Sequence, residues 1–369
     1  PKPQTPNPKP QTPNPDDNSL NTMNRTGHPS PPKIRNKDQG EDIQDLQSTK
    51  YKKMKEKYHI IERISEGNFG TVYKVKDLRT NQIYAMKKIV ASTKNRANFI
   101  REIETLELIQ HDNVVRIYDY EIKDNHISIV MEYCENTLYN YLKDAIYPLI
   151  KQNVKTIAFM ILSGLRELHS HGIVHRDIKP SNILISSLGV VKIGDFGLAI
   201  NIKEKDKDGN FPVEGFTTWY KPPEVLFGSR SYGPEFDIWS FGCVFGELLN
   251  GAPLFPGAND LHQVSKISEY LGSPTPDNWP SMQKLPDFGK ILFDKKPPLD
   301  LYTVFPDATK HEVVLLSKAL RYDQRATAES LLQSPYFSEY PPRLQKLIPE
   351  DKRIKIPVKK YEEIFNVHV

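Results

Sequence analysis

Three side chains between Asp177 and Asn182, in the stretch HRDIKPSN, could together do chemistry on a phosphate. Asp177 could accept or orient the proton of a substrate hydroxyl, Lys179 could lie beside the migrating phosphate, and Asn182 could hold a magnesium ion. The alternative is that these polar residues only cap a helix or close a turn between two apolar segments. The octapeptide therefore predicts phosphoryl transfer only if other parts of the chain supply the rest of the site.

A second motif, Asp195-Phe196-Gly197, follows shortly afterwards. The residues between the two motifs read ILISSLGVVKIG, two short β-branched runs around a Ser and Gly turn, and predict a hairpin. Such a hairpin would bring both motifs to one cleft. Asp195 would then bind magnesium between the phosphate oxygens.

The elements that must position these motifs are indicated by apolar periodicity. From Tyr58 onward, YHIIERISEGNFGTVYKVKDLRTNQIYAMKKI alternates apolar and polar residues and predicts three antiparallel strands. Gly67 and Gly70 lie at the first turn, where a flexible backbone could close over nucleotide phosphates. A helix is indicated by the spacing of Ile100, Ile103, Leu106 and Ile109, and a longer one by VKTIAFMILSGLRELHSHG, with Gly172 as its stop.

The length and composition narrow the class of protein. A chain of 369 residues can form one two-lobed domain or two domains, with room for tails. Its two cysteines, Cys134 and Cys243, exclude a disulfide framework and fit a reducing compartment. We find no signal peptide and no apolar run long enough to cross a bilayer, so we expect a soluble, intracellular protein without membrane insertion.

The two ends of the chain differ from the middle. Residues 1–50 are rich in Pro, Asn, Thr and Lys, repeat KPQTPNP, and are expected to be disordered. Lys and Arg outnumber Asp and Glu by 11 to 7 in residues 1–57 and by 7 to 4 in residues 340–369, whereas the rest has 32 against 35. The slightly acidic core argues against a nucleic-acid partner. For the basic tail, residues 338–369, packing on the folded core and docking of a partner both remain open.

These motifs resemble the protein-kinase family. TTWYKPPE at 217–224, GAPLFPG and LGSPTPDNWP are similar to landmarks of the cyclin-dependent-kinase-like branch, and KLPDF with GELLNGAPLFPGAND looks most like the cell-cycle-related kinase group near the CDK-activating kinases. The resemblance runs from about Tyr58 to Phe337. It implies an α+β, bilobal kinase fold over 58–337, with a small β-sheet lobe of five strands and one main helix (58–131), a hinge (132–134) and a larger, mainly helical lobe (135–337).

The resemblance also implies a site for ATP and Mg²⁺. Lys87 would contact the α and β phosphates, and Glu102 would pair with it, although strand lysines and helical glutamates are more often solvated. Ala85 would leave room for the base, Met131 would limit the depth of the pocket, and the hinge backbone would bond adenine. The implied nucleotide-binding residues are Ile64, Ser65, Gly67, Gly70, Val72, Ala85, Lys87, Met131, Glu132, Tyr133, Cys134 and Leu184.

Three structural links are implied as well. Thr217 would hydrogen-bond near Asp177 and Lys179. Glu224 would pair with Arg325. Asp237 would anchor the backbone of the catalytic loop, the segment HRDIKPSN at 175–182.

The sequence departs from the family pattern in the segment from Asp195 to Phe216, which contains no Ser, Thr or Tyr. Pro212 stands where an activating threonine is expected, and Arg176 normally pairs with the phosphate on that threonine. We hypothesise that a carboxylate takes the place of the phosphate. Alternatively, the segment is solvated and Arg176 is partnered otherwise. The candidate carboxylates are Glu214 first, then Glu204, Asp206 and Asp208.

Further departures concern regulation and specificity. Ser65 replaces the first glycine of the phosphate loop, and Asn68 and Phe69 stand where inhibitory phosphates are carried, so that control should be absent. Lys221 replaces the Arg of WYRAPE and lacks its planar fork, which puts a preference for proline after the phosphoacceptor in doubt. NRANFIRE stands where cyclin-dependent kinases have PSTAIRE, so a conventional cyclin cannot be assumed.

We therefore expect a serine/threonine kinase, because KPSN in the catalytic loop is typical of that class. The resemblance implies a protein substrate, namely a male-germ-cell-associated-type kinase phosphorylated on its activation loop, a cytoplasmic or nuclear location, and a role in cilium assembly or length. A cyclin-like or other activating partner would bind the helix that carries Glu102. The alternatives are a CDK-activating or cell-cycle/transcription kinase, a pseudokinase scaffold, and a protein whose working part is the Pro-rich tail.

Overall fold

The structure is a computed structural model that describes a defined part of the chain. The described residues are 54, 56–67, 70–90, 100, 103–104, 106–107, 109–123, 125–143, 149–203, 210–211 and 215–338. The tail predicted to be disordered, residues 1–50, and all of the basic tail after Ser338 lie outside them.

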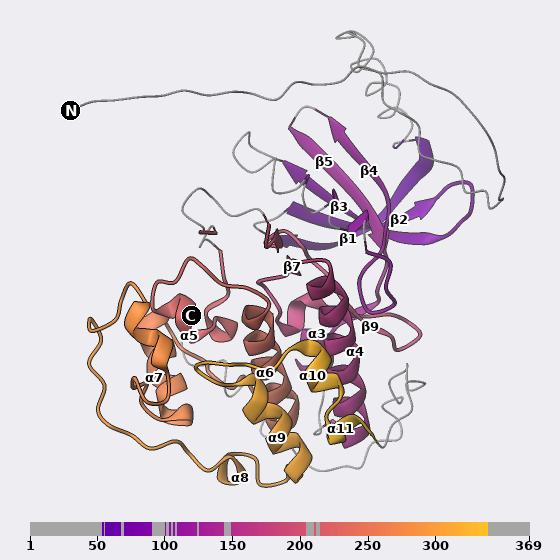
Figure 1. Cartoon of the computed structure of the whole chain (residues 1–369). Coiled ribbons are helices and arrows are strands. Elements are labelled where there is room, and N and C mark those ends of the chain that lie inside the picture. The colour runs from indigo at the N-terminus through magenta and orange to yellow at the C-terminus, as the bar shows by residue number, and fades with distance from the viewer. Residues whose placement is uncertain are drawn as a thin grey trace, which may run out of the picture. The chain divides into compact units, whose positions relative to one another are not determined.

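The amino-terminal part is one antiparallel sheet with the strand order β1-β2-β3-β5-β4 (Figure 1). Its first three strands confirm the prediction from the alternating pattern, and β1 pairs with β2 as β2 does with β3. Glycine is required at Gly70, where φ is 115° and a Cβ would clash with the carbonyl oxygen of Lys88. The strands are β1 (Tyr58–Gly67), β2 (Gly70–Asp77), β3 (Ile83–Val90), β4 (Ile117–Lys123) and β5 (His126–Glu132).

The predicted helix after β3 is only partly described. Residues 100, 103, 104, 106 and 107 are helical. Ile103 packs in a small core with Ile89, Ile127 and Ile129 of the sheet. Ile109 is buried but lies beyond the helical residues, so the predicted helical stripe extends one residue too far at this end.

The carboxy-terminal part is mainly helical and is built around α4 and α6, which lie side by side (Figure 1). Helix α6 is buried on all sides from Phe236 to Leu248, which is typical of a helix at the centre of a lobe. It ends at Gly251, a left-handed residue whose N–H donates to the carbonyl of Glu247. The helices are α3 (Leu138–Lys143), α4 (Lys151–Ser170), α5 (Pro223–Leu226), α6 (Glu235–Asn250), α7 (Asp260–Leu271), α8 (Leu301–Val304), α9 (Lys310–Ala319), α10 (Ala328–Leu332) and α11 (Pro335–Ser338), with 3₁₀ turns η1 (Pro180–Asn182), η2 (Thr218–Tyr220) and η3 (Pro280–Lys284).

Short strands lie between the sheet and the helices. The predicted hairpin is confirmed, because β8 (Ile183–Ile185) pairs antiparallel with β9 (Val191–Ile193). Strand β6 (Asn136–Thr137) joins β8 on its other side, and β7 (Ile173–Val174) pairs with β10 (Ile200–Asn201). The expected α+β architecture, with a small sheet lobe and a larger helical lobe, is thus confirmed.

The predicted link between Glu224 and Arg325 is also present. The Arg325 guanidinium donates to both carboxylate oxygens of Glu224, at 2.6 and 2.7 Å. Its side chain is only 2% exposed and lies 4.9 Å from the ring of Trp239. This ion pair therefore fixes α5 against the start of α10 from inside the lobe.

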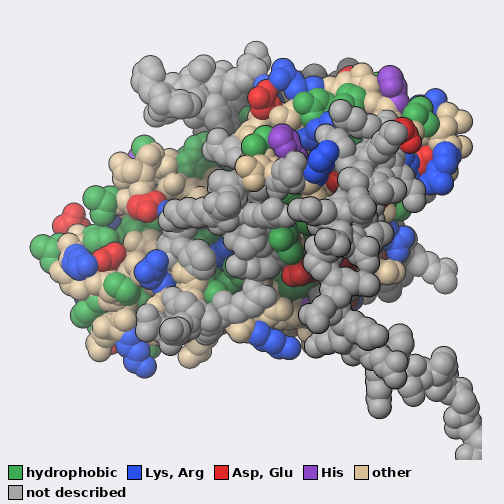
Figure 2. Space-filling model, turned by 90° about the horizontal axis from the view of Figure 1, so that it is seen from above, with side chains coloured by type: hydrophobic (Ala, Val, Ile, Leu, Met, Phe, Trp, Pro, Cys, Tyr) green, Lys and Arg blue, Asp and Glu red, His purple; other side chains and the backbone are tan. Residues whose placement is uncertain are grey.

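The surface carries mixed charge on the face drawn in Figure 2, where the described Lys and Arg side chains lie scattered and several have Asp or Glu beside them. No helix among the described residues combines the length and apolar character needed to cross a bilayer.

We expect Arg325→Gln to lower the free energy of unfolding by about 3 to 5 kcal/mol, because Glu224 would be left without its buried counter-charge. Urea denaturation would measure the change. The control is Lys290→Gln, which breaks an ion pair with Asp287 at a side chain that is 66% exposed and should cost no more than about 1 kcal/mol. Equal losses in the two variants would contradict the structural role given to Arg325.

Candidate active site

The loop that carries HRDIKPSN is held from beneath by Asp237. This carboxylate lies in the first turn of α6 and is fully buried. Its two oxygens accept the backbone N–H groups of His175 and Arg176, each at 2.8 Å, and His169 lies 2.9 Å away. Arg176 adopts a left-handed conformation, with φ of 66°. The expected anchoring of the loop by Asp237 is therefore confirmed, and the direction of the next residue, Asp177, is fixed by it.

Asp177 is surrounded by hydrogen-bond donors. Its Oδ1 accepts from the Thr217 hydroxyl at 3.0 Å, its Oδ2 accepts from Asn182 Nδ2 at 2.8 Å, and Lys179 Nζ forms an ion pair with the same Oδ2 at 2.8 Å. Lys179 also donates to Thr217 Oγ1 at 2.8 Å, as the predicted link required. The carboxylate is 5% exposed and is thus held in one orientation, from which it can accept a proton from a hydroxyl placed beside it.

Asn182 is oriented by the same network. Its Nδ2 donates both to the carboxylate and to the backbone carbonyl of Asp177, the latter at 2.9 Å. With the amide nitrogen engaged on that side, the Oδ1 oxygen is the atom that Asn182 offers to a cation. An oxygen ligand of this kind suits Mg²⁺.

Asp195 faces Lys87 of the sheet. Its Oδ1 is 2.8 Å from Lys87 Nζ, which comes from β3 and is buried. Phe196 is buried against the ring of His175, and His175 Nε2 lies 2.9 Å from the carbonyl oxygen of Gly194. The Asp195 segment, the catalytic loop and the sheet are therefore joined by contacts among these few residues.

The ionisation of Asp195 follows from these neighbours. Burial raises the pKa of its carboxyl group, but the interactions with Lys87 first, and then with His175 and Lys179, together outweigh that effect. The pKa therefore lies below its usual value, and the side chain is an anion able to ligate a cation at neutral pH. The described residues contain no cluster of three or more His, Cys, Asp and Glu side chains suited to a metal. An Asp and Asn pair completed by phosphate oxygens fits the way Mg²⁺ is commonly bound.

Most of the predicted nucleotide-binding residues lie on strands β1, β2, β3 and β5 of the sheet, whereas Leu184 is on β8 and Tyr133 and Cys134 follow β5 outside any strand. Val72 of β2 is paired with Ser65 of β1 on one side and with Lys87 of β3 on the other, and Ala85 is opposite Met131 of β5. A Cβ at Gly194 would come within 2.8 Å of Leu184, so this glycine lets the Asp195 segment pack on β8. A Cβ at Gly67 would meet nothing within 4 Å, and the exposed Ile64 lies on the same strand.

At the expected hinge, the backbone groups are not equivalent. The N–H of Glu132 donates to the carbonyl of Arg116 at 2.9 Å and is therefore already used. The hydrogen bonds expected for adenine would have to come from the other backbone groups of Glu132, Tyr133 and Cys134. The Glu132 carboxylate lies 3.0 Å from Lys192 of β9. Burial, followed by the negative charge of Glu132, raises the pKa of the Cys134 thiol to about 12, so the group is a thiol and not a thiolate at neutral pH.

Some predicted residues cannot be placed. Glu102, Asn68 and Phe69 lie outside the described residues, and so do Pro212 and the carboxylates suggested as partners of Arg176, namely Glu204, Asp206, Asp208 and Glu214. The pairing of Lys87 with Glu102 and the carboxylate hypothesis for Arg176 therefore stay predictions.

Sequence reasoning missed one contact beside the catalytic loop. Arg176 donates from Nε to the carbonyl of Leu198 at 2.6 Å and from Nη1 to the hydroxyl of Tyr232 at 2.7 Å. The only available signal was the position of Tyr232 in the segment that leads into α6, close to Asp237 in the chain.

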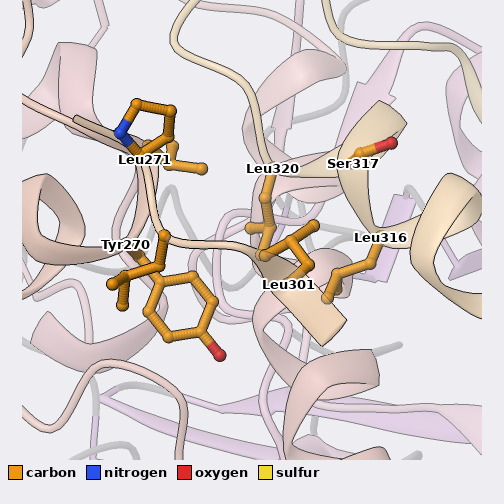
Figure 3. Close-up of a pocket in the computed structure, with 8 residues that line it drawn as sticks. Tyr270, Leu271, Leu301, Leu316, Ser317 and Leu320 are labelled. Atoms are coloured by element: carbon orange, nitrogen blue, oxygen red, sulfur yellow. The ribbon is translucent and has the colours of Figure 1, made fainter. Parts of the chain in front are cut away.

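A separate cavity of about 170 Å³ lies in the helical part, between α7, α8 and α9 (Figure 3). Leucines form most of its wall, together with Tyr270, Pro298 and Ser317. The hydroxyl of Tyr270 is buried and has no hydrogen-bond partner. Because the lining includes no carboxylate, imidazole or ammonium group, this cavity is not the candidate active site.

Comparison with known proteins gives one family. The protein kinase domain model matches residues 58–337. Cyclin-dependent kinase 20 of Danio rerio is 39% identical over 290 residues, 76% of this chain and 83% of that protein, and cyclin-dependent kinase 20 of Pongo abelii is 36% identical over 314 residues, 83% and 90%. Cyclin-dependent kinase 11B of Mus musculus is 37% identical over 300 residues, 78% of this chain and 37% of that protein.

The pairing of Lys87 with Asp195 predicts a pH-dependent effect on stability. With its pKa lowered in the fold, Asp195 stabilises the native state above its unfolded pKa, and this contribution is lost as the pH falls through the folded pKa. In Lys87→Met the burial remains without the main cation, so the pKa should rise and the ionised carboxylate should destabilise the fold. Urea denaturation should therefore show a larger deficit relative to the wild type at about pH 7 than at about pH 4.

The matched control is Lys290→Met, which removes a lysine from an exposed ion pair. It should show no such difference between the two pH values. A deficit in Lys87→Met that is the same at both would mean that Lys87 does not set the charge of Asp195.

Proposed function

The chain belongs to the protein kinase family, as a serine/threonine kinase of the cyclin-dependent-kinase type, and we propose that it transfers the γ-phosphoryl group of magnesium-bound ATP through Asp177 and its hydrogen-bonded neighbours. The observation that carries this proposal is the network in which Thr217, Lys179 and Asn182 all bond to the Asp177 carboxylate. The acceptor is a Ser or Thr hydroxyl of a protein.

In the proposed mechanism, each side chain of the network has one task. Asp177 accepts a hydrogen bond from the substrate hydroxyl and orients its oxygen toward the γ-phosphorus, taking the proton as the bond to phosphorus forms. Lys179, already beside Asp177, offers its ammonium to the charge on the migrating group. Thr217 is hydrogen-bonded to both Lys179 and Asp177 and so keeps the ammonium and carboxylate groups in fixed positions relative to each other.

The nucleotide would be held by residues of both lobes. Lys87 donates to the α and β phosphates, and Gly67 and Gly70, at the ends of β1 and β2, lie above them together with Ser65 of β1. The side chains of Ile64, Val72, Ala85, Met131 and Leu184 enclose the base, which bonds to the hinge at 132–134. Asn182 and Asp195 would hold Mg²⁺, which neutralises phosphate charge and helps to orient the γ-phosphoryl group.

We extend the proposal to the choice of substrate and partner. Similarity to cyclin-dependent kinase 20 supports the subgroup, and from it we propose a downstream kinase of the male-germ-cell-associated type as substrate, a cytoplasmic or nuclear location, and a role in cilium assembly or length. A cyclin-like or other activator would bind the helix with Glu102. Lys221 Nζ lies 2.8 and 3.0 Å from the carboxylate oxygens of Asp260, and we propose that a lysine so engaged gives only weak preference for proline after the acceptor.

We expect Asp177→Asn to reduce phosphoryl transfer by a hundredfold or more, roughly the contribution of a positioned general base. Incorporation of labelled phosphate from ATP into a protein substrate would measure it. The dissociation constant for ATP should stay within about twofold, because Asp177 bonds to the acceptor and not to the nucleotide. Asp287→Asn, a change at the surface, serves as the control and should leave the rate unchanged.

Two results would count against this function. A wild-type protein that binds ATP with magnesium but transfers no phosphate to any protein would be a scaffold. Full activity in Asp177→Asn would remove the role given to that carboxylate, even if the chain remains a kinase.

A further inference from the structure

The segment after Asp195 lacks a residue that phosphorylation could use. Between Asp195 and Phe216 the chain contains no Ser, Thr or Tyr, so no phosphate formed there can supply a counter-charge for Arg176. If the chain is the kinase proposed above, it needs another way to hold the arginine that precedes its catalytic base. The following inference rests on that proposed function.

Arg176 is buried, and two of the groups that hold it are neutral. Only 6% of its surface is exposed, and its guanidinium donates to the Leu198 carbonyl at 2.6 Å and to the Tyr232 hydroxyl at 2.7 Å. The guanidinium carbon also lies 5.4 Å from the centre of the Phe216 ring and 5.9 Å from that of Tyr232, both within the range of a cation–π contact. A buried cation needs such contacts to offset its loss of hydration.

These contacts connect three parts of the active site. Arg176 precedes the base Asp177, Leu198 follows the proposed magnesium ligand Asp195 by three residues, and Tyr232 leads into α6. The backbone of Arg176 is already tied to α6 through Asp237. A guanidinium bonded to both Leu198 and Tyr232 therefore sets the distance between the catalytic loop and the segment that follows the metal ligand.

Tyr232 is itself fixed by packing. It is 5% exposed, and its ring lies 5.4 Å from Phe211, 6.3 Å from Phe216 and 5.4 Å from Phe236. The backbone N–H of Phe211 donates to the carbonyl of Arg230 at 2.7 Å, which ties the two segments together beside the ring. Burial raises the pKa of Tyr232, although Arg176 acts in the opposite direction, so the hydroxyl is neutral at physiological pH.

We propose that Tyr232 is a positioning residue that holds Arg176 by its hydroxyl oxygen, and that this contact keeps the catalytic loop and the Leu198 segment in their active arrangement without phosphorylation of the segment. Tyr232 touches neither substrate nor nucleotide. It acts through Arg176 on the orientation of Asp177 and on the position of Asp195.

The test is Tyr232→Phe in the full chain. This change keeps the ring, its packing and its cation–π contact, and removes only the oxygen that accepts from Arg176. Hydrogen bonds to charged groups contribute more free energy than neutral ones, and we expect the loss of this one to misplace Asp177 and lower kcat by about tenfold or more. The KM for ATP should stay within about twofold, because the nucleotide contacts are unchanged. Treatment with a protein phosphatase should leave the activity of the wild type unaltered.

Tyr322→Phe is the matched control. Tyr322 is 7% exposed and its hydroxyl donates to the carbonyl of Gly272 at 2.7 Å, so this variant also loses one buried tyrosine hydrogen bond, but one made with the residue that follows α7 and not with Arg176. It should unfold more easily and keep its kcat. A fall in kcat that is equal in both variants, or none in Tyr232→Phe, would overturn the proposal.

A second measurement does not depend on activity. Amide hydrogen exchange should become faster in Tyr232→Phe, and not in Tyr322→Phe, at Ala199 and Ile202, whose N–H groups bond to the carbonyls of Phe196 and Gly172. Unchanged exchange at both would overturn the positioning role. Faster exchange in a protein whose wild type has no kinase activity would support the positioning role while showing the proposed function to be wrong.

Discussion

The buried carboxylate of Asp237 is the constraint on which the active site depends. A fully buried anion must be compensated by donors, and here the donors are two consecutive N–H groups of the catalytic loop and a histidine of α4. In the shape that makes these hydrogen bonds, the loop has Arg176 in a left-handed conformation. From that shape follow the orientation of Asp177 and the direction in which the Arg176 side chain leaves the loop.

Charge in the cleft is balanced within the protein itself. Lys87 faces Asp195, and Lys179 faces Asp177, each pair 2.8 Å apart. These lysines and aspartates are the groups proposed to meet phosphate and magnesium, and their mutual pairing offsets part of the cost of removing four charged side chains from water. When a nucleotide binds with its cation, the lysines would pair with phosphate in place of the aspartates, and Asp195 would pair with the cation in place of Lys87. The site can therefore be built before the substrate binds.

The sequence was informative wherever local pattern or short spacing carries the structure. Alternation predicted β1 to β3, and the Ser and Gly turn predicted the β8–β9 hairpin, because strand pairing is set by residues close in the chain. Family resemblance supplied the links of Glu224 with Arg325 and of Asp237 with the loop. Neither route reached the contact of Arg176 with Tyr232, since it joins two residues 56 positions apart and depends on a backbone angle that no side-chain pattern reports.

The segment 113–115 leads into strand β4 of the sheet, but its contacts are with β9 and α4 of the helical lobe. Val115 donates to Ile193, Ile193 donates to Asn113, and a Cβ at Gly164 of α4 would lie only 2.7 Å from the Asn113 carbonyl oxygen. This segment is therefore held to β9 by hydrogen bonds and packed against α4. Any swing of the sheet would pivot just before β4 and at Glu132, and its displacement would grow with distance from that axis, so Gly67 and Gly70 would travel further than the hinge residues proposed to bind adenine.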